Sequence, residues 1–347
     1  MRTRITELFG CRYPIVLSGM TGISNAELVA AVCNAGGLGI LATADLNAKQ
    51  TGDAIAEIRR LTDKPFGANV PLIIPGAEQK AEILIEEKVP VVNYTLGKGD
   101  RLIKAVHEYG GRTVATVTTE AHALSAQKSG VDALIVTGHE AAAHGGEVTS
   151  LVLIPWMADK MNVPVIAAGG FADGRGLAAA LALGADGIAM GTRFMNTKES
   201  PAHENMKVMT NENAAADTLY TDKLDGLPCR AAVSPGATAL IRDRLYLLKA
   251  VVNSRHAARA YGFHWTKAAA GILLAGFSKS RQLARMANAY KAITLAIDDG
   301  DTDRGLFLMG QVSGLVQETL SVEAVMQNVI AEAYAAQEAL AEKLGSR

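Results

Sequence analysis

The chain has 347 residues, a formal net charge of -1 and three cysteines. This length holds one barrel of about 250 residues and one further substructure. The near-neutral charge excludes the basic surface typical of proteins that bind nucleic acid or anionic membranes. Cys11, Cys33 and Cys229 are widely spaced and support neither a disulfide framework nor a CxxC metal site. Because no apolar run approaches the roughly eighteen residues of a membrane span, we expect a cytoplasmic protein that acts on small molecules.

Eight short apolar runs, most of them rich in valine or isoleucine, alternate with segments of helical spacing. The runs are Tyr13–Leu17, Leu38–Ala42, Phe66–Val70, Val89–Tyr94, Thr113–Val117, Ala133–Thr137, Val163–Ala168 and Gly187–Met190. Helical spacing is clear in Asn25–Ala35, Ala54–Leu61 and Gly176–Leu183. Strands that alternate with helices of this length predict a parallel sheet. Eight such units favour a closed TIM (β/α)₈ barrel.

The alternative fold is an open doubly wound sheet of the flavodoxin or Rossmann type. In a Rossmann sheet the phosphate-binding glycines lie in the first turn from strand to helix, and an acidic residue follows about twenty positions later. The glycine-rich segment Asn34–Gly39 instead precedes a strand. We therefore predict that this segment ends a helix.

The strongest signal for a ligand lies in the last two strand-helix units. Val163–Gly174 and Asp186–Phe194 each run from an apolar strand into small residues, where the backbone must turn and approach something closely. In a TIM barrel the loops after the seventh and eighth strands commonly hold a phosphate with backbone N–H groups. We therefore predict a phosphorylated cofactor at these two loops.

The alternation of strands and helices stops after Phe194. We predict a cofactor-binding barrel over 1–203, a helical substrate or lid region over 204–298, and a C-terminal segment over 299–347 that returns to the barrel. Expected helices in the last two regions are Thr238–His256, Arg281–Ile297 and Ser321–Leu344, with a looser segment at Asp225–Gly236.

The predicted lid carries an aromatic cluster of Tyr261, Phe263, His264 and Trp265. Such a cluster either contacts an apolar ligand or packs helices together. We expect Trp265 to contact the substrate.

Polar residues follow the sixth strand between Gly138 and Gly146. His139 and His144 are expected to face the barrel mouth, where an imidazole can exchange protons near neutral pH, although one of them could simply order the loop. A zinc site with Glu140 is the rival interpretation. We predict no metal, because the histidines are not an i, i+4 pair and no third ligand stands out. At the end of the third strand, Asn69 either contacts a flavin ring or fixes a turn.

Several segments form a set with a known pattern: Pro14–Ile15 with Gly19–Met20, Ala35–Leu38, Lys64–Asn69, Glu140–Gly145, Ala168–Gly174 and Met190–Phe194. Together they resemble the nitronate monooxygenase (2-nitropropane dioxygenase-like) family of FMN-dependent TIM barrels. The resemblance runs in order over residues 1 to about 204 and returns from Gly300 to Gly314. Flavin-type enoyl-acyl-carrier-protein reductases and NAD(P)H:quinone reductases share this signature. It therefore specifies the cofactor better than the reaction.

The resemblance implies where FMN binds. Residues expected to contact the flavin ring or to hold its phosphate are Gly19, Met20, Asn69, Ala168, Gly169, Gly170, Gly191 and Thr192. Thr116, Thr137 and Ala142 complete the predicted cofactor site, and each departs from the pattern of related sequences. The two threonines replace a lysine and an acid of some quinone reductases, and Ala142 with Ala143 replaces a pair of glycines before the family's histidine.

The resemblance also implies a reaction. His144 is expected to be the active-site histidine, acting as a base or as a group that orients the substrate, and His139 is expected to contact the substrate. The implied reaction is oxidation of alkyl nitronates, or of nitroalkanes, with O₂ to a carbonyl compound and nitrite. The alternative is NAD(P)H-dependent reduction of quinones, enones or enoyl-acyl-carrier-protein, and a non-enzymatic FMN-binding barrel is a third class. The sequence gives no signal for an oligomeric state.

Overall fold

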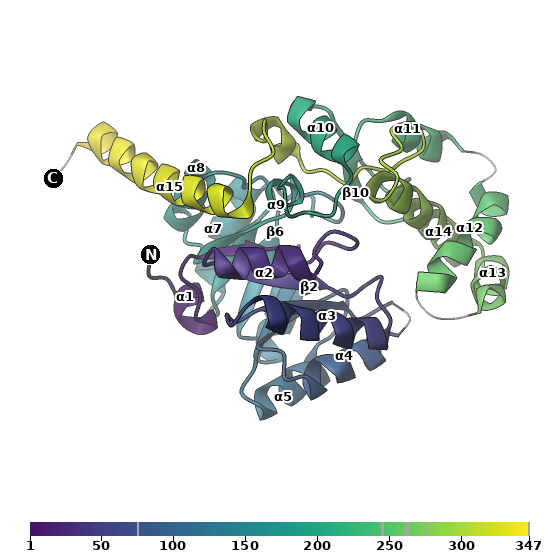
Figure 1. Ribbon diagram of the computed structural model, residues 1–347, viewed down its shortest axis with the longest axis horizontal. Coiled ribbons are helices and arrows are strands. Elements are labelled where there is room, and N and C mark those ends of the chain that lie inside the picture. Colours follow the sequence, from purple (N-terminus) through teal and green to yellow (C-terminus); the bar gives the residue numbers. More distant parts are fainter. Residues whose placement is uncertain (75, 244–245, 261–263, 275, 346–347) are drawn as a thin grey trace.

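The computed structural model describes residues 1–74, 76–243, 246–260, 264–274 and 276–345. Eight parallel strands follow one another around a closed barrel, and β8 pairs with β1 to close it (Figure 1). The strands are β1 (Ile15–Leu17), β2 (Leu38–Ala42), β3 (Gly67–Pro71), β4 (Val91–Thr95), β5 (Arg112–Val117), β6 (Ala133–Thr137), β7 (Val165–Ala168) and β8 (Gly187–Met190). Each overlaps the run predicted for it. The predicted TIM barrel is confirmed.

Helices surround the barrel, and the strands separate an outer layer of core from an inner one. They are α2 (Ala26–Asn34), α3 (Ala48–Leu61), α4 (Ala77–Glu86), α5 (Asp100–Glu108), α6 (Glu120–Lys128), α7 (Ser150–Lys160) and α8 (Gly174–Ala182). Their apolar faces pack on the outward side chains of the strands in one large cluster. Inside the barrel a second cluster forms, in which Ile5 and Phe9 of α1 (Arg4–Phe9) pack against Val16 and Leu38. The first helix therefore fills the end of the barrel at which the strands begin.

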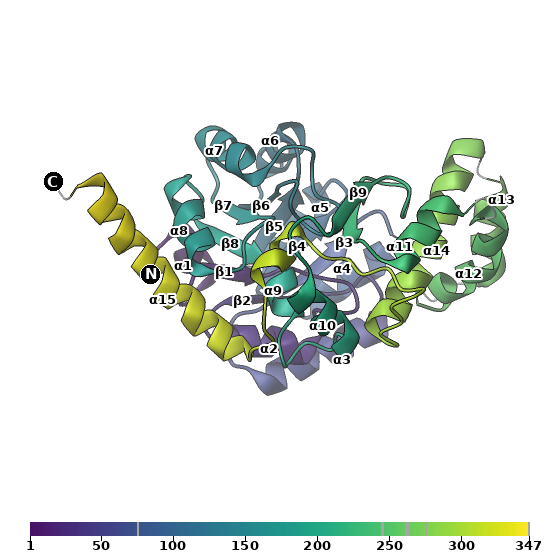
Figure 2. The ribbon, with the colours of Figure 1, turned by 90° about the horizontal axis from the view of Figure 1, so that it is seen from above.

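The segment after β8 forms a subdomain of helices beside the barrel. Its elements are α9 (Thr192–Met195), α10 (Glu204–Glu212), β9 (Thr218–Thr221), β10 (Cys229–Ala232), α11 (Pro235–Arg242), α12 (Tyr246–Ala260), α13 (Trp265–Leu274) and α14 (Phe277–Ile297). Figures 1 and 2 show α11 to α14 on the opposite side of the barrel from the C-terminal end of the chain.

Two expectations for this region are wrong in detail. The looser segment around Asp225–Gly236 contains β10, which pairs antiparallel with β9, so the region is not made of helices and loops alone. The single helix expected over Thr238–His256 is two helices, because the backbone of Asp243 is extended at the end of α11. Ser234 caps the start of α11, and Pro235 takes its first position, where a missing N–H costs nothing.

The last segment returns to the barrel through η1 (Gln311–Leu315) and α15 (Val322–Leu344). The first half of α15 buries Val325 and Val329 against α8 and α2. Gly174 permits this approach, because a Cβ there would lie 2.2 Å from the backbone nitrogen of Ala333. The second half of α15 extends past the barrel in both views. Within the described residues, no helix combines the length and apolarity that crossing a bilayer requires.

Candidate active site

A cavity of about 960 Å³ opens where the barrel strands end. Every residue predicted to bind the cofactor lines it, together with the predicted catalytic histidine: Gly19, Met20, Asn69, Thr116, Thr137, Ala142, His144, Ala168, Gly169, Gly170, Gly191 and Thr192. The cavity continues under the inserted helices, where its wall is formed by Lys267, Gly271, Ile272, Leu283, Met286, Tyr290 and Ile293. The structure thus brings the predicted cofactor residues and part of the inserted region together around one space.

The end of β7 forms a cradle of backbone. Gly169 and Gly170 have φ angles of +95° and +84°, in the left-handed region that favours glycine. A Cβ on Gly169 would lie 3.0 Å from the carbonyl oxygen of Gly138, so a side chain would press on the neighbouring loop. Among the described residues, none accepts a hydrogen bond from the backbone amides of these two glycines. Free amides at such a turn fit an anionic group such as a phosphate.

The C-terminal segment packs against the same loops. The backbone amide of Gly310 donates to Thr192 Oγ1 at 3.1 Å, and that of Gln311 donates to the carbonyl oxygen of Glu140 at 3.0 Å. A Cβ on Gly310 would lie 2.9 Å from that same carbonyl oxygen. Gly310 therefore lines the cavity next to the predicted phosphate loops, a role that the sequence alone did not indicate.

Ser150 connects the loop after β6 to the cradle. Its backbone amide donates to the Glu140 carboxylate at 2.9 Å. Its hydroxyl lies 2.7 Å from the carbonyl oxygen of Gly169 and 2.9 Å from Glu140 Oε2. The two loops are thereby held as one unit at the start of α7.

A polar chain crosses the strand ends on the other side of the cavity. Asn69 Nδ2 donates to Asn93 Oδ1 at 2.6 Å, and Asn93 Nδ2 donates to Thr116 Oγ1 at 3.0 Å. Asn69 lines the cavity, and its side chain joins β3 to β4 and does not fix a turn; contact with a flavin ring stays a prediction. Asn93, which lines the cavity as well, was not predicted, because nothing in its local sequence marks it.

A half-buried acid at the rim of the cavity lies near a buried amine. Asp45 lines the cavity, and burial raises the pKa of its carboxyl group. Lys80 Nζ donates to the carbonyl oxygen of Ala44 at 2.8 Å. Burial lowers the pKa of Lys80 to about 8, against the opposing effect of the Asp45 carboxylate.

His144 meets an acidic residue from the inserted region. Its Nε2 lies 2.7 Å from Asp225 Oδ2, and both residues line the cavity. The preceding residue, Ala143, has a φ of +52°, in the left-handed region that favours glycine. Ala143 and Arg230 exchange backbone hydrogen bonds at 3.0 and 2.9 Å. The hairpin of β9 and β10 is thus attached directly to the loop between Gly138 and Gly146, which we call the histidine loop.

Two residues expected to contact the substrate do not line the cavity. The His139 ring packs edge-on against Tyr220 with centroids 4.5 Å apart, and its Nδ1 lies 3.0 Å from the carbonyl oxygen of Gly146. The Arg255 guanidinium lies over the Trp265 ring at 4.7 Å. Tyr261 and Phe263, from the same predicted cluster, fall outside the described residues.

One group of potential metal ligands exists within the described residues. Potential ligand atoms of His144, Asp225 and Cys229 lie within 4.8 Å of one another. The structure therefore places two further potential ligands, which the sequence did not indicate, beside the histidine. Two ligands of one tetrahedral zinc ion at about 2.0–2.1 Å would be roughly 3.3 Å apart, whereas the His144 and Asp225 atoms are 2.7 Å apart. Burial also raises the pKa of the Cys229 thiol, and a thiol binds metal as the thiolate. The geometry is that of a hydrogen-bonded imidazole and carboxylate.

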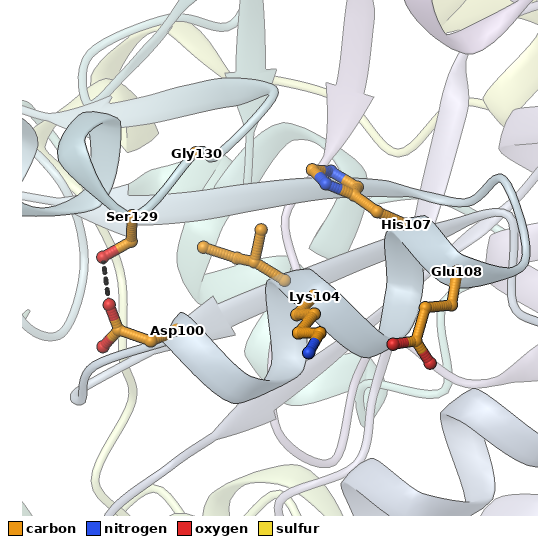
Figure 3. A pocket seen from close by; sticks show the side chains of 7 residues that line it. Asp100, Lys104, His107, Glu108, Ser129 and Gly130 are labelled. Carbon is orange, nitrogen blue, oxygen red and sulfur yellow. Dashed lines mark hydrogen bonds between the residues drawn. The ribbon is translucent and has the colours of Figure 1, made fainter.

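A second depression of about 470 Å³ lies along the outside of α5 (Figure 3). Three of its polar residues make contacts that join neighbouring units of the barrel. Ser129 Oγ donates to Asp100 at 2.7 Å, and His107 Nε2 lies 2.7 Å from Asp132 Oδ2. These contacts link α5 to the segment between α6 and β6.

Comparison with known proteins shows the family and the fold of the chain. The sequence profile of the family described as nitronate monooxygenase matches residues 2–76 and 73–332. A relative from Rhodococcus jostii (strain RHA1), "(3aS,4S,5R,7aS)-5-hydroxy-7a-methyl-1-oxo-octahydro-1H-indene-4-carboxyl-CoA dehydrogenase", is 35% identical over 96% of both chains. FabK from Thermotoga maritima has a TM-score of 0.83 with 33% identity over 99% of both chains. The nitroalkane oxidase from Streptomyces ansochromogenes has a TM-score of 0.76 with 27% identity, over 97% of this chain and all of that one.

The profile match covers nearly the whole chain, and the similarity to the Rhodococcus relative includes the inserted region. The chain therefore belongs to the nitronate monooxygenase family and is a flavin-dependent oxidoreductase.

Proposed function

We propose that this enzyme binds FMN in the barrel mouth and oxidises or reduces a bulky apolar carbonyl compound, of which an acyl thioester is the favoured class. The observation that carries this proposal is the shape of the cavity, which continues from the backbone cradle to the inserted helices. Ile272, Met286 and Ile293 give that far part an apolar wall. Apolar walls with a few polar groups at one end are typical of sites for large apolar ligands.

The residues of the barrel mouth fit FMN. Gly169 and Gly170 offer free amides for the phosphate, and Asn69 offers an amide side chain to the polar edge of a flavin ring. FMN, when bound, supplies hydride transfer, and the protein supplies orientation and proton exchange. His144 lines the cavity at the mouth and is the group that we propose for proton exchange with the substrate.

The choice of substrate class rests on size and similarity. A short-chain nitronate beside FMN would leave the space under α13 and α14 unfilled. The Rhodococcus relative is named for a bicyclic carboxyl-CoA substrate, and this chain is similar to it over the inserted helices as well as the barrel. An acyl thioester with a branched or cyclic apolar body would place its carbonyl near His144 and its body against Met286 and Ile293.

Nitronate oxidation is the second candidate. The Streptomyces neighbour is named as a nitroalkane oxidase, and its structure covers nearly the whole chain. The side chain of His144 is 39% exposed at the mouth, where an imidazolium would attract a small anion. Nitronate oxidation with O₂ would use this histidine loop, which belongs to the barrel, and would leave the space under the inserted helices unused.

An anaerobic mixing experiment separates the two candidates. The holoenzyme is mixed without oxygen with NADH, NADPH or a bicyclic acyl-CoA, and the flavin absorbance is followed. We expect at least one of these compounds to bleach the flavin rapidly. If none does, while aerobic nitroethane nitronate is turned over to nitrite, the thioester proposal is wrong and nitronate oxidation replaces it.

A further inference from the structure

We propose that Asp225 is a positioning residue for His144: it holds the imidazole so that Nε2 carries the proton and Nδ1 is left to exchange a proton with the substrate. The contact joins residues that are 81 positions apart in the sequence, at 2.7 Å between Nε2 and Oδ2. The inference rests on the proposed function, in which His144 exchanges a proton with a substrate in the cavity.

The assignment of the protonated nitrogen follows from the chemistry of the partner. An ionised carboxylate only accepts hydrogen bonds, so Nε2 must donate to it. In a neutral imidazole the other nitrogen is then the acceptor, and this nitrogen is the site for a proton. Asp225 itself is held by the turn that carries it, because its Oδ1 accepts the backbone amide of Leu227 at 3.1 Å.

Asp225 lies in the turn between β9 and β10. This hairpin makes hydrogen bonds to the histidine loop on both sides of His144. The Tyr220 hydroxyl donates to the carbonyl oxygen of Gly145 at 2.9 Å, on the far side of His144. The Arg230 guanidinium donates to the carbonyl oxygen of His139 at 3.0 and 3.1 Å. The hairpin cannot move away from the loop without breaking these hydrogen bonds. The Asp225 carboxylate and the His144 imidazole are therefore held in a fixed position relative to each other. Fixed partners of this kind select the tautomer of a catalytic histidine in other enzymes.

The direct test is the protonation pattern of His144 in histidine-labelled holoenzyme, observed by ¹⁵N NMR. We expect the neutral ring to carry its proton on Nε2 in the wild type and to populate both tautomers in Asp225→Asn. His144→Gln identifies the resonance by removing it. A neutral ring that carries its proton on Nδ1, or a pattern unchanged in Asp225→Asn, would overturn the inference.

Kinetics provide the second test. Asp225→Asn keeps the size of the side chain, and we expect it to lower kcat by at least about 10-fold while KM and the flavin spectrum stay unchanged. Asp225→Glu should restore part of the loss. Asp222→Asn, an exposed carboxylate of the same hairpin, is the matched control and should have normal kcat.

A double-mutant cycle separates failure of this inference from failure of the proposed function. In a His144→Gln background, Asp225→Asn should cause no further loss, because residues that act as a unit are not additive. Normal turnover in His144→Gln would overturn both the role of His144 and the inference. A large loss in His144→Gln with normal turnover in Asp225→Asn would overturn the inference alone.

Discussion

The cradle after β7 and the wall under the inserted helices line the same cavity but are built differently. The cradle consists of backbone, and its glycines lie within a short stretch of sequence at Gly169 and Gly170. The wall consists of side chains such as Ile272 and Met286, which reach the cavity from separate helices. Under the proposed function, cofactor recognition is therefore concentrated in local motifs, whereas substrate recognition depends on tertiary contacts. This difference explains how relatives with one signature can bear the names of different reactions.

The first prediction concerns the cradle, which a side chain would fill. Gly169→Ala places a Cβ 3.0 Å from the carbonyl oxygen of Gly138, and we expect FMN affinity to fall by about 100-fold or more, equivalent to roughly 2.7 kcal/mol. The measurement is the flavin content and the circular dichroism of purified protein. Gly110→Ala is the matched control, because Gly110 has a φ of +83° and open space around it. Equal loss of flavin in both variants would mean that backbone strain, not the cradle, is responsible.

The second prediction concerns the histidine loop, to which the β9–β10 hairpin of the inserted region is attached. We expect His144→Asn to lower turnover of a neutral nitroalkane or acyl thioester by about 10²- to 10⁴-fold. An already ionised nitronate should lose much less, because it needs no base. His139→Asn is the control, since His139 does not line the cavity. The assignment would move to His139 if only that variant lost activity.

A third prediction concerns the buried amine of Lys80, which lies beside the loop after β2. The pKa of Lys80 is about 8 in the folded protein, below the ordinary 10.5, so the unfolded chain binds more protons between these values. Stability should therefore rise with pH from about 8 to about 10.5, by up to roughly 3 kcal/mol from this group. Urea unfolding of the wild type and of Lys80→Met at several pH values measures the difference. Identical pH dependence in the two proteins would contradict the burial of the amine.

A fourth prediction concerns the apolar wall of the cavity under the inserted helices. Met286→Ala removes apolar surface from the cavity, and we expect KM for a bulky substrate to rise by about 10-fold with FMN still bound. Trp265→Ala should leave KM unchanged, because Trp265 packs against Arg255 and does not line the cavity. The reverse pattern would return the aromatic cluster to the substrate site.

The smallest expected effect lies at the junction of the histidine loop and the hairpin. Ala143 has a φ of +52°, which costs an alanine roughly 1–2 kcal/mol. Ala143→Gly should raise the free energy of unfolding by up to about 1 kcal/mol, because the greater freedom of glycine in the unfolded chain offsets part of the relief. Ala142→Gly, where φ is not positive, should instead lower it by about 0.4–1 kcal/mol. Losses of equal size in both variants would contradict the strain at Ala143.

The sequence predicted the barrel well, because each buried parallel strand is a short apolar run between helices. The cavity residues of the barrel were also predictable, since Gly169 and Gly191 stand at strand ends where small residues are required. The strands and the cradle thus depend on interactions that are close in sequence.

The inserted region was less predictable. Asp225 reaches His144 across 81 residues, and no local pattern signals such a contact. The β9–β10 hairpin lies in a segment with weak alternation, and it is stabilised by docking on the loop after β6. Trp265 was expected at the substrate because aromatic clusters favour ligands, but here its ring is packed by Arg255.

Identification of the cofactor in the purified wild-type protein tests the central claim most directly. The protein is denatured, the released flavin is separated from the chain, and its identity and amount are measured. We expect FMN at about one per chain, because the cradle offers room and free amides for a single phosphate group. Release of FAD, or of no flavin even after incubation with excess FMN, would contradict the account of this cavity.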